Sequence, residues 1–196
     1  MRKPMRWQFS LAAAVYITLW LYYDRSGDAV QSICAAVFHE CGHLLALVCL
    51  RDTPQKLCFG VYGMRIERAE TTRLSYAKEL LCAAAGPAAN VLLALLLLLW
   101  RGGSARARRG VQINLLLAAF NLTPIRPLDG GAILYALLCR RFLPDEAQKI
   151  SKQAAACTVV PLAAVGILLF IRGRRDYTLF LSSLYVVLLL LPSISI

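Results

Sequence analysis

Long apolar segments constrain what this chain can fold into more than any other feature of its sequence. About six stretches with few charges approach the length that crosses a bilayer. They are residues 8–23, 29–50, 77–100, 111–139, 154–171 and 177–194. The hydrophobic fraction of 59% and the charged fraction of 17% also lie outside the range usual for soluble domains. We therefore predict an all-α, polytopic, integral membrane protein with about six transmembrane helices.

Length and charge limit the organisation and the partners of the chain. Its 196 residues suit one domain, so we predict a single membrane-embedded domain over 1–196 with a core at about 29–139. The net charge of +11 comes from short clusters of lysine and arginine between apolar segments. This pattern indicates contact with the headgroups of the lipid bilayer and excludes nucleic acid as a partner. The same clusters favour a cytoplasmic N-terminus, although the basic loop "RGGSARARRG" opposes that bias.

Two segments depart from plain transmembrane helix. The fourth span contains "NLTPIRPLDGG" at 121–131, whose two prolines and two glycines break a helix. Broken backbone at membrane depth survives only where protein buries it or where it lines a wet cavity, so we expect a polar pocket there. Between the second and third spans, apolar residues alternate around Gly60 and Gly63. Either a short β-hairpin at 57–67 or an irregular interfacial loop fits this pattern.

The only two histidines of the chain lie four residues apart in the second span. His39, Glu40 and His43 form the pattern H-E-x-x-H, in which two imidazoles bind zinc and the glutamate is the general base for the attacking water. An ionisable group in hydrocarbon costs roughly 2.5–3.5 kcal/mol or more, so Glu40 needs a partner or a function there. We predict one Zn²⁺ per chain, bound by both histidines, with Glu40 as the catalytic base.

A catalytic zinc usually has three protein ligands, so the chain has to supply one more. Away from loops and interfaces the acidic residues are Glu40 and Asp129, and Asp129 lies in the interrupted stretch of the fourth span. Because Glu40 is needed as the base, we predict Asp129 as the third ligand. The metal site would then lie between the second span and the interrupted fourth.

Two asparagines are candidates for supporting roles. Asn121 begins the broken segment, where it would either bind substrate backbone and the developing oxyanion or cap a freed helix end. Asn90 is polar within the apolar run "CAAAGPAANVLLA". We expect Asn90 to donate or accept hydrogen bonds across the bundle and to support the helices of the metal site. The small residues before Pro87 allow neighbouring helices to approach closely.

Three motifs in this order resemble the site-2 protease family of intramembrane zinc metalloproteases. They are "HECGH" at 39–43, "AGPAAN" at 85–90 and "NLTPIRPLDGG" at 121–131. In that family the two histidines and the aspartate bind zinc, the glutamate activates water, and the asparagine that matches Asn121 is associated with substrate positioning. The resemblance implies cleavage of transmembrane segments of membrane-tethered regulatory proteins, such as a sigma factor precursor or an anti-sigma factor, in a bacterial cytoplasmic membrane.

The six-span plan is similar to the subgroup that contains the sporulation protease of pro-sigma-K, but without the CBS domain that many members carry. Two other classes of protein are alternatives: a catalytically inactive membrane scaffold and a metal-binding transporter. A transporter usually has polar residues along a pathway, whereas here they concentrate at one place. A scaffold would be free to lose Glu40, which this chain keeps.

Overall fold

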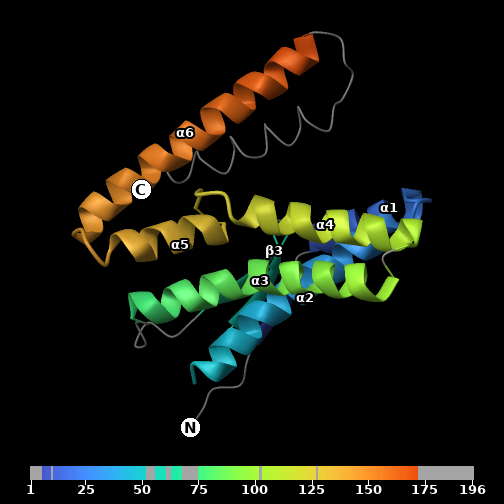
Figure 1. Ribbon diagram of the computed structural model, residues 1–196, viewed down its shortest axis with the longest axis horizontal. Helices are drawn as coiled ribbons and strands as arrows, with labels where there is room; N and C mark the ends of the chain where they lie inside the picture. Colours follow the sequence, from blue (N-terminus) through green and yellow to red (C-terminus); the bar gives the residue numbers. More distant parts are fainter. Residues whose placement is uncertain are drawn as a thin grey trace. The chain divides into compact units, whose positions relative to one another are not determined.

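The computed structural model describes residues 6–9, 11–51, 56–60, 63–67, 75–101, 103–126 and 128–171. The chain divides into two compact units, Met1–Phe120 and Asn121–Ile196, which we describe one at a time. The elements follow the chain in the order β1 (Arg6–Phe9), α1 (Leu11–Tyr23), α2 (Asp28–Cys49), β2 (Lys56–Gly60), β3 (Gly63–Glu67), α3 (Tyr76–Arg101), α4 (Ala105–Asn121), α5 (Asp129–Leu138) and α6 (Pro144–Ile171). Figure 1 labels the helices and β3. The predicted span at 177–194 lies outside the described residues.

A small sheet in the first unit has the strand order β1-β2-β3. Strands β2 and β3 pair antiparallel from Lys56 with Glu67 to Gly60 with Gly63, which is the hairpin that the alternating sequence allowed. Strand β1 pairs in parallel with β2. The predicted span at 8–23 therefore needs correction, because its first residues belong to a strand. The remaining helix α1 has 13 residues, about 20 Å at 1.5 Å per residue, which is short of a bilayer core.

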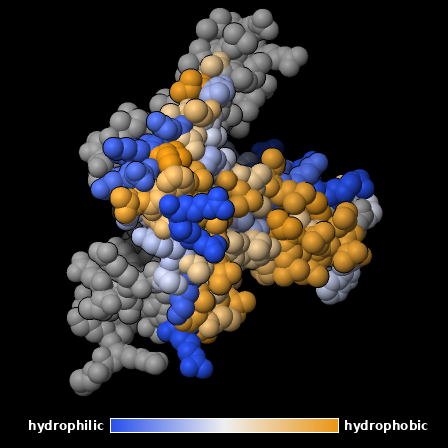
Figure 2. Space-filling view, turned by 60° about the vertical axis from the view of Figure 1, so that its left-hand side comes forward, coloured by the Kyte–Doolittle hydropathy of each residue, from blue (hydrophilic) through white to orange (hydrophobic). Residues whose placement is uncertain are grey.

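Two helices in the described ranges are long and apolar enough to cross a membrane, α2 and the part of α3 up to Trp100. Helix α2 buries Ala35, His39, His43 and Leu47, which recur every fourth residue and so share one face. Its opposite face is also apolar and is exposed, with Val37, Leu45 and Val48 between 58% and 69% accessible. A helix that is apolar all round suits a position between protein and lipid. Figure 2 shows such hydrophobic side chains gathered over broad areas of one face.

The predicted fourth span is interrupted where its prolines and glycines indicated. Helix α4 ends at Asn121 and α5 begins at Asp129. The boundary at its other end was wrong, because α4 begins at Ala105 and takes in most of the segment predicted as a basic loop. Ser104 explains the early start. Its hydroxyl accepts the backbone N–H of Ala107 at 3.0 Å, and its carbonyl accepts that of Arg108, as expected of a helix N-cap.

Helix α6 also begins earlier than predicted. It begins at Pro144, ten residues before the expected span at 154–171. Proline is favoured in the first turn of a helix, and Asp145 and Glu146 follow it, where negative charge interacts favourably with the helix dipole. The polar residues at the start of α6 therefore form a helix that hydropathy alone does not detect.

Candidate metal centre

Helices α2 and α3 pack closely in the first unit because small residues face one another. A Cβ atom on Gly42 would lie 2.5 Å from the carbonyl oxygen of Ala85 and 2.8 Å from the Cβ of Ala89. A Cβ atom on Gly86 would lie 2.7 Å from Nε2 of His39 and closer still to Nε2 of His43. Real Cβ atoms do not approach so near, so α3 passes against the two ring nitrogens only because residue 86 is glycine.

The two histidine side chains form a buried pair. His39 is 5% and His43 is 9% exposed. Their ring centroids are 4.8 Å apart and the rings are nearly perpendicular, at 81°. The two Nε2 atoms lie 3.2 Å from each other. The i, i+4 spacing on one helix thus brings one nitrogen of each ring to a single point, as the sequence predicted.

Hydrogen bonds at the other ring nitrogens place a proton on Nδ1 of both rings. His43 Nδ1 lies 2.8 Å from the carbonyl oxygen of Cys82, which can only accept, so this nitrogen carries a proton. His39 Nδ1 lies 2.7 Å from Oδ1 of Asn90. The amide nitrogen of Asn90 donates to Ala35 and Asn114, so its oxygen is the end that faces His39 and accepts from it. Asn90 is fully buried, and its Oδ1 holds the ring of His39 by this hydrogen bond.

This arrangement fits a bound cation. A neutral imidazole with its proton on Nδ1 has its lone pair on Nε2, so each ring can offer Nε2 to a cation. Two nitrogens that each lie about 2.0–2.1 Å from a tetrahedral zinc ion would be about 3.3–3.4 Å apart. The separation and the tautomers of the pair therefore match those of two zinc ligands.

Glu40 follows His39 on α2 and is half-buried. The motif thus provides a carboxylate on the helix that carries the two nitrogen donors. A carboxylate next to a metal-binding pair is the usual arrangement for a general base that acts on water.

Asp129 belongs to the second unit, where the chain around it is tightly folded. It is the first residue of α5, and a carboxylate in the first turn interacts favourably with the positive end of the helix dipole. The preceding turn is closed by backbone bonds from Ile125 to Thr123 at 2.7 Å and from Leu128 to Ile125 at 2.8 Å. A Cβ atom on Gly131 would lie 2.6 Å from the backbone nitrogen of Arg126, so the turn packs directly on the first residues of α5.

Two other polar residues of the broken segment, Asn121 and Arg126, lie at its start and in its turn. Asn121 is the last residue of α4, so both roles considered for it, substrate contact and helix capping, stay open. The guanidinium of Arg126 lies 4.2 Å from the ring centroid of Tyr135, one turn and a half into α5. This cation–π contact ties the turn to the helix that follows it. Sequence reasoning left Arg126 unassigned, because spacing does not reveal a stacking partner.

Two contributions to the histidine pair were missed from the sequence, the carbonyl of Cys82 and the amide of Asn114, and the close approach at Gly86 was predicted only as helix packing. Gly86 had a signal, since it precedes Pro87 in a run of small residues. Asn114 also had one, as a polar residue in the apolar run "INLLLAAF". The carbonyl of Cys82 had none, because every residue has a carbonyl.

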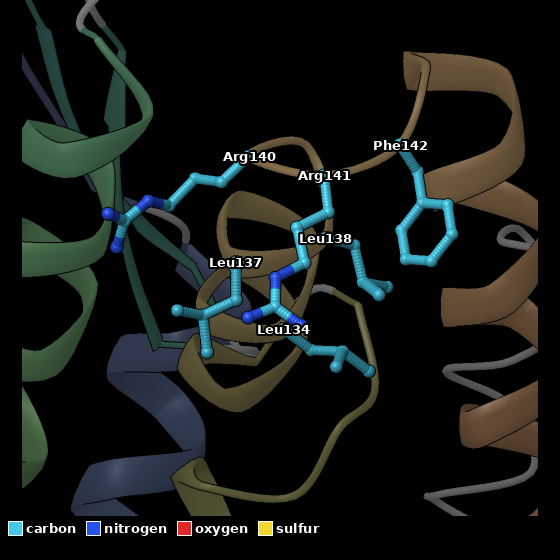
Figure 3. Close-up of a pocket in the computed structure, with 6 residues that line it drawn as sticks. All are labelled: Leu134, Leu137, Leu138, Arg140, Arg141 and Phe142. Carbon is cyan, nitrogen blue, oxygen red and sulfur yellow. The ribbon is translucent and has the colours of Figure 1, made fainter.

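A cavity of about 500 Å³ lies in the second unit at the C-terminal end of α5. Figure 3 shows the residues that line it, which are Leu134, Leu137, Leu138, Arg140, Arg141 and Phe142. None of them is a usual zinc ligand or a general base. The two arginines follow the last turn of α5, where positive charge is favourable. The cavity is therefore not part of the candidate metal centre.

Two comparisons with known proteins found similarity, one to a family model and one to a solved structure. The family model of peptidase family M50 matches residues 109–162, which include Asn121 and Asp129 but neither histidine. The fold is similar to a solved structure, the Site-2 Protease from Methanocaldococcus jannaschii, with a TM-score of 0.65 and 22% identity over 93% of this chain and 87% of that chain. No curated protein matches.

The family model covers 54 of the 196 residues, and the solved structure at 22% identity shows a shared fold. Both comparisons agree with the site-2 protease family, which the three motifs resemble. The subgroup stays a prediction.

Proposed function

We propose that this protein is an intramembrane zinc metalloendopeptidase that hydrolyses peptide bonds in or near transmembrane segments of membrane-tethered regulatory proteins. The observation that carries the proposal is the pair of buried Nε2 atoms, 3.2 Å apart, on an apolar helix that also carries Glu40. The sequence predicts that His39, His43 and Asp129 together bind the metal ion. We assign them as the ligands of one Zn²⁺ per chain.

Glu40 is the residue that moves the proton in this proposal. A bound zinc ion would lower the pKa of water toward 7 and polarise the scissile carbonyl. The carboxylate of Glu40 takes a proton from the attacking water and then gives it to the leaving amine nitrogen. The Nδ1 bonds of His39 and His43 hold both rings in orientation during these steps. The carbonyl of Cys82 can only accept, and the amide of Asn90 could turn only by losing its bonds to Ala35 and Asn114.

A transmembrane substrate has to be partly unwound before cleavage, because its carbonyls are engaged in i to i−4 hydrogen bonds. Strand β3 forms one edge of the sheet β1-β2-β3. Its backbone offers the pairing groups that an extended substrate segment would gain in place of its helical bonds. We assign Asn121 a contact with the substrate backbone, with capping of α4 as the alternative. The proposed substrates are a sigma factor precursor or an anti-sigma factor in a bacterial cytoplasmic membrane, and the proposed N-terminus is cytoplasmic.

The proposal is tested by Glu40→Gln and Asp129→Asn, with metal analysis and co-expression of candidate membrane-tethered sigma and anti-sigma factors. Glu40→Gln should slow cleavage by about 10²- to 10⁴-fold, the usual contribution of a general base, with one zinc per chain retained. Asp129→Asn should instead weaken zinc binding itself. Cleavage at the normal rate by Glu40→Gln would refute the base. Zinc binding by the wild type, with no cleavage of any substrate tested, would favour the scaffold alternative.

A further inference from the structure

Asn114 on α4 is hydrogen-bonded to Asn90, which in turn is hydrogen-bonded to His39. It is 3% exposed and its Oδ1 accepts the side-chain N–H of Asn90 at 2.9 Å. Its own Nδ2 donates to the backbone carbonyl of Gly110, one turn earlier, at 2.8 Å. A backbone carbonyl can only accept, so this bond decides which end of the Asn114 amide is nitrogen and which is oxygen.

That choice passes along the hydrogen bonds to the ring of His39. Because Nδ2 of Asn114 donates to the carbonyl of Gly110, Oδ1 of Asn114 faces Asn90. Only the amide nitrogen of Asn90 can donate to that oxygen. The oxygen of Asn90 then faces His39 Nδ1 and requires a proton there. We infer that Asn114 is a positioning residue for the candidate metal centre, because it holds the amide of Asn90 in the orientation that leaves the lone pair of His39 on Nε2.

A second acceptor limits how much Asn114 contributes. Asn90 Nδ2 also lies 3.2 Å from the carbonyl oxygen of Ala35 on α2, a longer bond than the one to Asn114. Without Asn114, only the longer bond to Ala35 would hold the amide nitrogen of Asn90. We therefore expect the Asn90 amide to sample both orientations and not to adopt the reversed one alone. His43 depends on the carbonyl of Cys82 and lies outside this chain of bonds, so its tautomer should be independent of Asn114.

Helix α4 lies against both of its neighbouring helices at Gly110. A Cβ atom there would lie 2.9 Å from Oε1 of Gln31 on α2 and 3.0 Å from Cδ1 of Leu97 on α3. The same glycine thus lets α4 approach both neighbouring helices and accepts the hydrogen bond of Asn114. Ala118, one turn further and 3% exposed, lies on the same buried face but takes no part in the hydrogen bonds. It provides a matched position for separating packing from orientation.

The inference rests on the proposed function, since it assigns a purpose to the tautomer of a zinc ligand. Its test nevertheless begins with the metal-free protein. The chain has only two histidines, so histidine-selective ¹⁵N labelling gives the ring signals of this pair alone. In the wild type, both rings should carry the proton on Nδ1. In Asn114→Leu, the signals of His39 should show a mixture of tautomers, while those of His43 should be unchanged.

Zinc affinity is the second measurement, made by chelator competition on the full chain. Asn114→Leu should raise the zinc dissociation constant by about 10-fold, at the lower end for loss of a group that orients a metal ligand. Asn114→Ser is a milder variant, since its hydroxyl still reaches a carbonyl one turn back but is too short for Asn90. It should produce the same shift even if the leucine variant folds poorly. Ala118→Val should alter stability and leave the tautomers and the zinc affinity unchanged.

A wild-type His39 tautomer in both Asn114 variants, with unchanged zinc affinity, would overturn the inference. Equal loss of zinc affinity in Ala118→Val would also overturn it, because Asn114 would then act only through the packing of α4. If the tautomer of His39 changes as expected but the wild-type protein cleaves no substrate, the inference stands and the proposed function fails.

Discussion

The histidine pair and Asp129 are held in their places by different means. The rings of His39 and His43 are fixed by acceptors on α3 that lie 51 and 39 residues away in the sequence. Asp129 is fixed by its own neighbours, through the closed turn before it and the glycines after it. The family model matches the second region and not the first. A local motif can carry its own geometry, whereas a pair of ligands on a regular helix depends on the helices packed against it.

Gly86→Ala should have the largest effect, because it places a methyl group against both Nε2 atoms of the pair. We expect the zinc dissociation constant to rise by about 100-fold or more, at or beyond the upper end for disturbed support of a metal ligand. Chelator competition measures this change. Gly103→Ala is the control, since a Cβ atom there meets nothing within 4 Å. Affinity within twofold of the wild type in Gly86→Ala would show that the pair does not depend on the close approach of α3.

Gly130→Ala should have an intermediate effect and act on the second region. The added methyl would press on the backbone of Leu122 and Thr123, which cannot rotate away as a side chain can. Forcing an extra methyl into a packed site costs about 1–3 kcal/mol, so we expect a loss of that size in the free energy of unfolding. Denaturation in detergent, again with Gly103→Ala as control, measures it. The ¹⁵N ring signals of the metal-free histidines should not change, and a change in them would break the distinction between the two regions.

Asp24→Asn should have the smallest effect, on local structure at the start of α2. The carboxylate of Asp24 accepts the hydroxyl of Ser26 at 2.5 Å and the backbone N–H of Ala29 at 2.8 Å. The Ser26 hydroxyl, and then the Ala29 N–H, hold the pKa of Asp24 below its ordinary value.

The sign of the pH dependence follows from that lowered pKa. A depressed carboxyl pKa stabilises the folded protein above the unfolded value, near 3.9, and the stabilisation is lost as the pH falls through the folded pKa. The melting temperature of Asp24→Asn should therefore be slightly below that of the wild type at pH 7. The difference should begin to shrink as the pH falls below about 4 and should vanish below the folded pKa. A difference that stays constant over this range would rule out the charge of Asp24 as its origin.

The comparison between regions also explains which predictions from the sequence were accurate. The break at 121–131 was predicted because proline and glycine act on the backbone within a few residues. The hairpin at 57–67 was one of two structures that the local alternation allowed, the other being an irregular interfacial loop. The span at 8–23 was wrong because β1 pairs with a strand about 50 residues later, a contact with no local signal. The start of α4 was also misplaced, because hydropathy hides a helix whose first turns are basic and whose cap is Ser104.

By itself the sequence determined the chemistry that is available: two imidazoles on one helix face, a carboxylate beside them, a second carboxylate after a broken segment, and apolar surroundings that make each of these groups costly without a purpose. Only the tertiary structure decided how the imidazoles are oriented. The proton on each Nδ1 is set by an acceptor on α3, and Gly86 leaves room for the two Nε2 atoms to meet. The physical reason is that spacing along one helix fixes which side chains are neighbours, whereas the rotation and protonation of a ring depend on hydrogen bonds that distant parts of the chain supply.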